Sequence, residues 1–202
     1  MNIAINLVGD SFGTRNRDWR RCKNSLFEKV INCWDNYNIS IYVTTYENET
    51  SNELIKCFNP KKYSLLNRNE YEQRTAYIHS LKQLTNENID FVISTRFDII
   101  FNEKISNYNI DFTKFNFLFR EGGPWWTTHK FTTDTMFCYN FKFNNTLIES
   151  ITEFHTIPYT KYPDLHPTYR YIVPKIGKDN INFMINESHL SHENPIYNLD
   201  RT

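Results

Sequence analysis

Short apolar runs alternate with amphipathic stretches along the first part of the chain, and this alternation is its strongest structural signal. Runs with the composition and length of buried strands occupy residues 3–8, 39–46, 63–66, 91–93 and 116–120. Between them, apolar residues recur at helical spacing in residues 18–35, 51–57 and 70–85. Strands that alternate with helices in this way predict a mostly parallel sheet with right-handed crossover connections.

The regular alternation ends after residue 120. Residues 121–130 combine two glycines with the adjacent Trp125 and Trp126 and have no periodicity, so we expect an irregular loop. Beyond this loop we expect a strand over 136–139, a helix over 143–154, a helix or irregular segment over 165–173, a strand over 181–185 and an ordered loop over 189–201. No repeat or low-complexity linker interrupts residues 1–202, so one domain suffices.

Composition narrows the class of protein. The chain is 40% hydrophobic and 16% aromatic, enough for a sizeable core, and its formal net charge is zero. Zero net charge argues against a nucleic-acid-binding protein that depends on a general basic field. The four cysteines form no C-x-x-C pair, so neither a zinc site nor a disulfide framework is expected. No signal-peptide pattern occurs and no apolar run approaches the ~18 residues of a transmembrane helix. We therefore expect a soluble, cytoplasmic protein.

Arg96 and Asp98 stand between two apolar runs, 91–93 and 99–101. On a strand, residues two apart point to the same side, so the two side chains would converge near the carboxyl end of the strand. In open α/β sheets ligands bind at that end, although an ordinary ion pair that caps a core strand fits the pattern equally well. Thr45, at the end of another expected strand, could likewise contact a nucleobase or be an ordinary strand-end hydroxyl.

The first expected strand ends at Val8 and Gly9, a step that commonly opens a nucleotide-binding α/β domain. The spacing from Gly9 to Gly13 matches neither the dinucleotide fingerprint nor the P-loop. Arg15 and Arg17 follow, just before an expected helix. Arginines at a helix N-terminus oppose the helix dipole unless an anion is present. A bound diphosphate would supply that anion, and so would Asp or Glu side chains from elsewhere in the chain.

Asp98 also has the chemistry of a metal ligand, because Mg²⁺ and Mn²⁺ favour carboxylate together with phosphate oxygens. His189, or His192 in the same tail, would give a second ligand, although isolated histidines are more often structural or solvated. Asp134 is a candidate general base, with Glu121 as its rival; such a base must lie within hydrogen-bond reach of its proton.

Several short segments resemble GT-A-type glycosyltransferases, above all the small enzymes of viral glycan and bacterial capsule or lipopolysaccharide synthesis. The resemblance lies in residues 3–9, the Gln73-Arg74 pair, and residues 91–98, which read Phe-Val-Ile-Ser-Thr-Arg-Phe-Asp. Residues 133–139 resemble the acceptor-side segment of these enzymes, and residues 194–201 resemble their C-terminal closing segment. Arg96 stands where the usual Asp-x-Asp motif has its first Asp.

This resemblance implies a GT-A-like (Rossmann-like) single α/β domain with a mostly parallel, mixed sheet flanked by helices. About residues 1–101 would bind the nucleotide-sugar, and about residues 102–202 would bind the acceptor. The donor-binding residues would be Val8, Gly9, Arg15, Arg17, Thr45, Arg74 and Arg96. Mn²⁺ or Mg²⁺ would bind at Asp98 and His189, unless Arg96 replaces part of the charge of the cation.

The predicted reaction transfers a sugar from a nucleotide-diphosphate sugar, with a UDP-sugar as first candidate, to a hydroxyl of a glycan acceptor. Trp125 and Trp126 would stack on the acceptor, although the pattern slightly favours their folding back on the core, and Asp134 would deprotonate the acceptor. Two alternatives remain: a nucleotidyltransferase acting on sugar phosphates, and a non-catalytic glycan-binding module of the same fold. The expected partners are the nucleotide-sugar donor and the glycan acceptor, and no nucleic acid is expected among them.

Overall fold

A seven-stranded sheet forms the centre of the computed structural model, which describes residues 1–155 and 165–200. In spatial order its strands are β3 (Lys62–Leu66), β2 (Asn38–Tyr46), β1 (Asn2–Val8), β4 (Phe91–Thr95), β8 (Met136–Asn140), β6 (Phe115–Phe117) and β9 (Ile181–Phe183). Every neighbouring pair is parallel except the two that involve β8. The predicted single α/β domain with a mostly parallel, mixed sheet is therefore confirmed.

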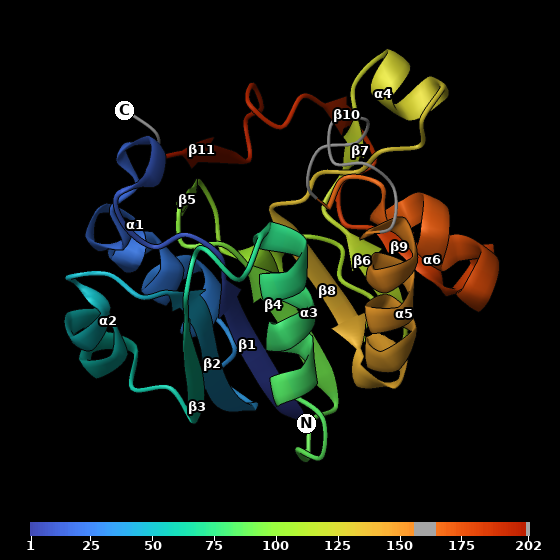
Figure 1. Ribbon diagram of the computed structural model, residues 1–202. Helices are drawn as coiled ribbons and strands as arrows, with labels where there is room; N and C mark the ends of the chain where they lie inside the picture. The colour runs from blue at the N-terminus through green and yellow to red at the C-terminus, as the bar shows by residue number, and fades with distance from the viewer. Residues whose placement is uncertain (156–164, 201–202) are drawn as a thin grey trace.

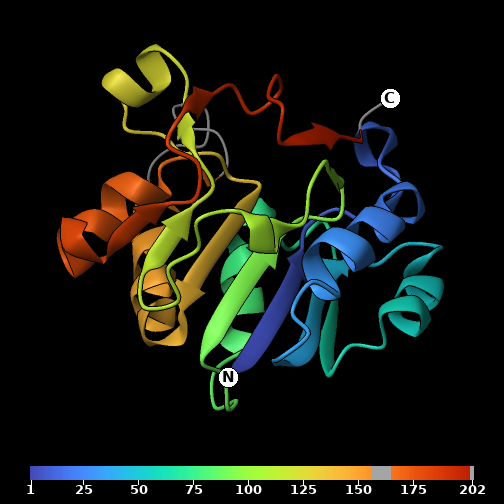
Figure 2. The same ribbon diagram turned by 180° about the vertical axis from the view of Figure 1, so that it is seen from behind.

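Helices cover both faces of this sheet. The longer ones are α1 (Trp19–Ser25), which continues into the π-helical η2 (Leu26–Ile31), α2 (Ser51–Phe58), α3 (Gln73–Gln83), α5 (Asn144–His155) and α6 (Thr168–Ile176). Shorter ones are η1 (Thr14–Asn16), η3 (Ile105–Asn107), α4 (Pro124–Thr127), η4 (Phe141–Phe143) and η5 (Lys178–Asn180). Figure 1 shows α3 and α5 on the near face, and Figure 2, from behind, shows α1 on the other.

The alternation of side chains along β1 creates two separate cores. Ile3, Ile5 and Leu7 pack with α1, η2 and α2 on one face. Ala4 and Val8 point the other way and pack with α3, α5 and α6. Because successive residues of a strand face opposite sides, a continuous apolar run such as that of β1 is the pattern of a strand covered on both faces.

Most element boundaries differ little from those that the sequence predicts. The helix expected over 18–35 is N-capped by Asp18, which accepts a hydrogen bond from the Arg20 backbone N–H at 3.0 Å, but it ends at Ile31. The prediction of one strand over 116–120 is wrong. The chain leaves β6 after Phe117 and forms a separate short strand, β7 (Arg120–Glu121). β7 pairs in parallel with β10 (Ser188–His189). The irregular loop expected over 121–130 contains the single turn α4.

The tail is more regular than predicted. β11 (Tyr197–Leu199) pairs antiparallel with β5 (Ile99–Phe101), the short strand that follows Asp98. The Asp200 backbone N–H donates to the Asp98 carbonyl oxygen at 2.9 Å, and the Asp200 carboxylate forms an ion pair with Arg21 at 3.0 Å. The expected loop is thus partly a strand, which ties the end of the chain to α1 and to the segment after β4.

No helix in the described part of the chain is long and apolar enough to cross a membrane.

Tyr197 anchors the tail, and we expect its hydroxyl to contribute measurably to stability. Its side chain is 2% exposed, and its hydroxyl lies 3.0 Å from the Ser191 carbonyl oxygen and 3.2 Å from the Thr133 hydroxyl. Tyr197→Phe should lower the free energy of unfolding by about 1–2 kcal/mol, since it removes buried hydrogen bonds without a large cavity. Urea unfolding measures this. Tyr63→Phe, at a 54% exposed tyrosine, is the matched control; equal stability of the two variants would contradict the prediction.

Candidate functional site

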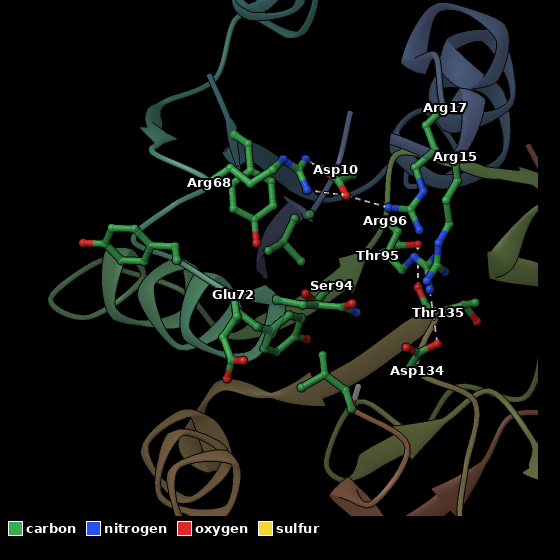
Figure 3. A pocket seen from close by; sticks show the side chains of 17 residues that line it. Asp10, Arg15, Arg17, Arg68, Glu72, Ser94, Thr95, Arg96, Asp134 and Thr135 are labelled. Carbon is green, nitrogen blue, oxygen red and sulfur yellow. Dashed lines mark hydrogen bonds and ion pairs between the residues drawn. The ribbon is translucent and has the colours of Figure 1, made fainter. Parts of the chain in front are cut away.

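A cavity of about 280 Å³ opens at the carboxyl ends of β1, β2 and β4, beside the N-terminus of α3 (Figure 3). Its lining includes Val8 and Gly9 after β1, Ser94 and Thr95 at the end of β4, and Asp134 just before β8. This is the edge of the sheet at which open α/β folds bind ligands. The cavity therefore lies at the edge of the sheet where the order of strands predicts a ligand site.

The loop after β1 brings arginines to this edge. Gly9 has φ 112°, a conformation that favours glycine, and its N–H donates to the Thr44 carbonyl oxygen at 3.0 Å. Arg15 and Asn16 have φ of 54° and 58°, which is uncommon for residues with a side chain. The loop turns sharply there, and Arg15 and Arg17 both line the cavity.

Arginines and aspartates alternate along one wall of the site. Arg17 pairs with Asp10 and with Asp98, both at 2.8 Å. Arg96 binds Asp98 through two N–H groups, at 2.9 and 2.6 Å, and lies 3.3 Å from Asp134. Arg96 and Asp98 do converge as expected, but in the bend between β4 and β5, not on the strand itself.

The pKa values of Arg17 and Arg96 are shifted in opposite directions. Burial lowers the pKa of Arg17, and the nearby cations Arg96 and Arg15 lower it further, against the opposing effect of Asp98. Burial also acts to lower the pKa of Arg96, but the carboxylates of Asp98 and Asp134 outweigh it and raise that pKa. Arg96 is therefore a fixed cation, whereas Arg17 lies where positive charge is crowded.

A second cavity of about 210 Å³ lies beyond Asp134. It is lined by Glu121, Trp125, Phe131, His166, Leu190, Ser191 and His192. His166 separates the two cavities: its Nδ1–H donates to the Thr132 carbonyl oxygen at 2.8 Å, and its Nε2 faces Asp134 at 3.6 Å. The indole of Trp125 is 48% exposed and stacks on Phe131 with ring centroids 5.9 Å apart. An exposed aromatic face beside polar groups is a surface on which a sugar ring can stack.

Some of the expected donor-binding residues line the first cavity and others do not. Val8, Gly9, Arg15, Arg17 and Arg96 line the first cavity.

Thr45 and Arg74 are not among the described residues that line it. The Thr45 hydroxyl donates to the Ser11 hydroxyl at 2.8 Å, as an ordinary strand-end hydroxyl would. Arg74 is buried and donates to the Phe154 carbonyl oxygen at 3.0 Å, which joins α3 to the end of α5.

The two tryptophans also have different environments. Trp125 lines the second cavity, whereas Trp126 packs edge-on against Tyr169 and Phe183, with the Arg120 guanidinium 5.4 Å from its ring centroid. Trp126 thus folds back on the protein, and Trp125 alone of the pair contributes to a cavity wall.

The residues expected from the sequence did not include Asp10, Arg68 or His166, which line the two cavities. Asp10 and Arg68, which form an ion pair, line the first cavity, and the Arg68 guanidinium lies 4.2 Å from the ring centroid of Tyr46. Their positions, directly after strands 3–8 and 63–66, could have indicated them, because both strands end at the same edge. His166 belongs to no motif, and only the three-dimensional fold brings it to Asp134.

The residues expected to hold a divalent cation do not form a suitable donor set. Both carboxylate oxygens of Asp98 accept hydrogen bonds from Arg96, and one also pairs with Arg17. The ring of His189 packs edge-on against Phe119 at 5.4 Å. Among residues 1–155 and 165–200, no group of three or more His, Cys, Asp or Glu side chains could hold a metal ion. In this arrangement Asp98 is the counter-ion of two arginines.

Comparisons with known proteins give similarity in structure only. No family model matches the sequence, and no curated protein sequence is detectably similar to it.

Solved structures that share the architecture include transferases of two kinds. A glycosyltransferase involved in glycosylation of the major capsid of PBCV-1 has a TM-score of 0.55 and 14% identity, over 93% of this chain and 82% of that one. The galactosyltransferase LgtC, solved with donor and acceptor sugar analogs, has a TM-score of 0.53 and 11% identity, over 91% and 73%. A putative glucose-1-phosphate thymidylyltransferase from Bacillus anthracis, in complex with sucrose, has a TM-score of 0.51 and 12% identity, over 93% and 87%. Identities this low establish the fold and not the reaction, so the chain shares a GT-A-like α/β fold with these enzymes.

Proposed function

We propose that this chain is a glycosyltransferase that moves a sugar from a nucleotide-diphosphate sugar to a hydroxyl of a glycan acceptor. The observation that carries the proposal is the pair of adjoining cavities. One is lined by arginines at the carboxyl ends of parallel strands, and the other by an exposed tryptophan, with Asp134 and His166 between them. Transfer between two substrates requires two such sites that meet at one reacting group.

The arginine-lined cavity is assigned to the donor. Arg15, Arg17 and Arg96 would bind the diphosphate and stabilise the negative charge that builds on it as the bond to the sugar breaks. Tyr46 and Tyr71 line the same cavity and offer aromatic rings for a nucleobase. A UDP-sugar is the first candidate donor.

The second cavity is assigned to the acceptor, with Trp125 stacking on its sugar ring. Asp134 would take the proton of the acceptor hydroxyl if the reaction inverts configuration. His166 would act as a positioning residue. Its Nδ1–H is committed to the Thr132 carbonyl, so its Nε2 is oriented toward Asp134, where a hydroxyl entering from the second cavity would arrive.

A nucleotidyltransferase is the second candidate, favoured by the likeness to the thymidylyltransferase and by the arginine-lined cavity, which would also suit a nucleoside triphosphate. A non-catalytic glycan-binding module would use the second cavity alone. We place either enzyme in the cytoplasm, and the four free thiols of Cys22, Cys33, Cys57 and Cys138 are compatible with a reducing compartment.

Nucleotide binding tests the proposal first. At a concentration about 100 times its Kd, a ligand stabilises the fold by ~2.7 kcal/mol, which raises the Tm of a domain of this size by roughly 5–10 °C. We expect at least one of UDP, GDP, CDP and dTDP to produce such a shift in a thermal-unfolding assay. No shift with any of them would reject both enzyme proposals and leave the binding module. Mass spectrometry then separates the enzymes, because a nucleotidyltransferase transfers a nucleoside monophosphate and releases pyrophosphate.

Asp134→Asn should separate catalysis from donor binding. We expect a loss of transfer of about 10²–10⁴-fold, the usual contribution of a general base, with the nucleotide-induced Tm shift retained. The release of nucleoside diphosphate in the presence of a panel of mono- and disaccharides measures transfer. Asp35→Asn, at an exposed aspartate, is the control. Unchanged transfer by Asp134→Asn would move the role to Glu121, which Glu121→Gln then tests.

A further inference from the structure

We infer that the donor site binds a nucleoside diphosphate without a divalent cation, with the Arg96 guanidinium in the place where a metal ion would neutralise the phosphates. The inference rests on the proposed function, since it concerns how the same cavity holds its diphosphate. It deepens that function by assigning Asp98 as the residue that positions Arg96.

Both carboxylate oxygens of Asp98 are bound by arginines. Asp98 is 2% exposed, Arg96 binds both its oxygens, and Arg17 adds a third contact at 2.8 Å. A carboxylate coordinates a metal through the same lone pairs that accept these hydrogen bonds. A cation at Asp98 would therefore compete with these guanidinium groups for the carboxylate oxygens and would lie beside them as a like charge.

Arg96 retains donors for an anion. A guanidinium carries five N–H donors. Asp98 accepts from two of them and Asp134 from a third, so two remain on the side chain of a residue that lines the cavity. The fork of contacts with Asp98 fixes the orientation of the guanidinium plane, which is the preorganisation that a bound metal ion provides in other sites.

Arg15 adds a cation that no carboxylate in the described chain neutralises by an ion pair. It is exposed, its backbone is left-handed, and its side chain lines the cavity on the same side as Arg17 and Arg96 (Figure 3). Burial lowers the pKa of Arg17, and the nearby cations Arg96 and Arg15 lower it further, so the three guanidinium groups lie close enough to repel one another. A diphosphate would relieve this crowding, whereas a divalent cation would increase it.

Asp10, in the loop after β1, is bound by arginines as Asp98 is. One of its oxygens accepts from Arg17 at 2.8 Å and from Arg68 at 3.1 Å. Both aspartates nearest the arginines are thus bound by guanidinium groups, and the described cavity offers cations to its ligand.

Titration calorimetry with and without metal tests the inference. The probe is UDP, or whichever nucleoside diphosphate gives the largest Tm shift, added to protein in excess EDTA and in excess manganese chloride. We expect the two Kd values to agree within a factor of about three, a difference of less than 1 kcal/mol. Binding that disappears in EDTA would overturn the inference and leave the proposed function intact. No binding in either buffer would reject the proposed function, and the inference with it.

Arg15→Gln tests the role of the arginines in a variant that leaves the buried ion pairs in place. We expect it to weaken binding of the same nucleotide in EDTA by about 10-fold or more, because it removes a charge-assisted hydrogen bond to phosphate. Manganese should not restore the affinity. Arg170→Gln, at an exposed arginine of α6, is the matched control. Equal affinity of the two variants, or full rescue by manganese, would contradict the assignment.

Asp98→Asn distinguishes a positioning residue from a metal ligand. We expect the Tm to fall by about 5–10 °C, because Arg96 and Arg17 lose a buried counter-ion, while Asp35→Asn changes it little. We also expect manganese alone to leave the Tm of the unaltered protein unchanged. A manganese-induced rise of that Tm that is absent from Asp98→Asn would show a metal site at Asp98 and overturn the inference.

Discussion

The carboxylate of Asp98 lies between the guanidinium groups of Arg17 and Arg96, and segments far apart in the chain are joined through this contact. Arg17 belongs to the loop after β1, Arg96 to the bend after β4, and Asp134, the next partner of Arg96, to the approach to β8. The backbone of Asp98 also accepts a hydrogen bond from Asp200, which ties the tail to the same point. Removing one member of such a buried network leaves uncompensated charge, so these segments depend on one another.

The same network connects the two cavities. Beyond Asp134 it continues through His166 to Glu121, which lines the second cavity and accepts a hydrogen bond from the Ser191 hydroxyl. The ion pairs of Arg17 and Arg96 with Asp98 and Asp134 hold these side chains in one orientation, so the groups proposed to bind phosphate and to accept a proton are fixed before any substrate arrives. Preorganised charge of this kind stabilises a transition state without a cost of reorganisation at the moment of reaction. The ion pairs therefore matter more for the geometry of the site than for net stability.

The periodicity of the sequence correctly predicted features that depend on a local pattern of apolar residues. It failed for strand pairings and side-chain contacts that depend on residues far away in the chain. The residues of β1 are apolar on both faces because both are covered, so the strand, the fold class and the edge that carries the cavity followed from the sequence. β11 has only the three residues Tyr197–Leu199, and its pairing with β5 leaves no local trace. Arg74 and Thr45 have the chemistry of binding residues, yet the Phe154 carbonyl and the Ser11 hydroxyl engage them. His166 was missed because its role comes from position alone.

Fold likeness explains where the site lies but not what it does, because the same architecture occurs in glycosyltransferases and in a sugar nucleotidyltransferase. The distinguishing features are local. Either reaction joins two substrates and needs a nucleotide site and a second site, and the second site would take a glycan in the proposed glycosyl transfer and a sugar phosphate in nucleotidyl transfer. Trp125 and His166 line the second cavity, and the Nε2 of His166 lies 3.6 Å from Asp134. An exposed tryptophan in its wall is the reason to propose a glycan as its occupant. Arg96, which stands where an aspartate was expected, lines the first cavity and not the second, so under the proposed function it would affect how the donor is bound and leave the acceptor site unchanged.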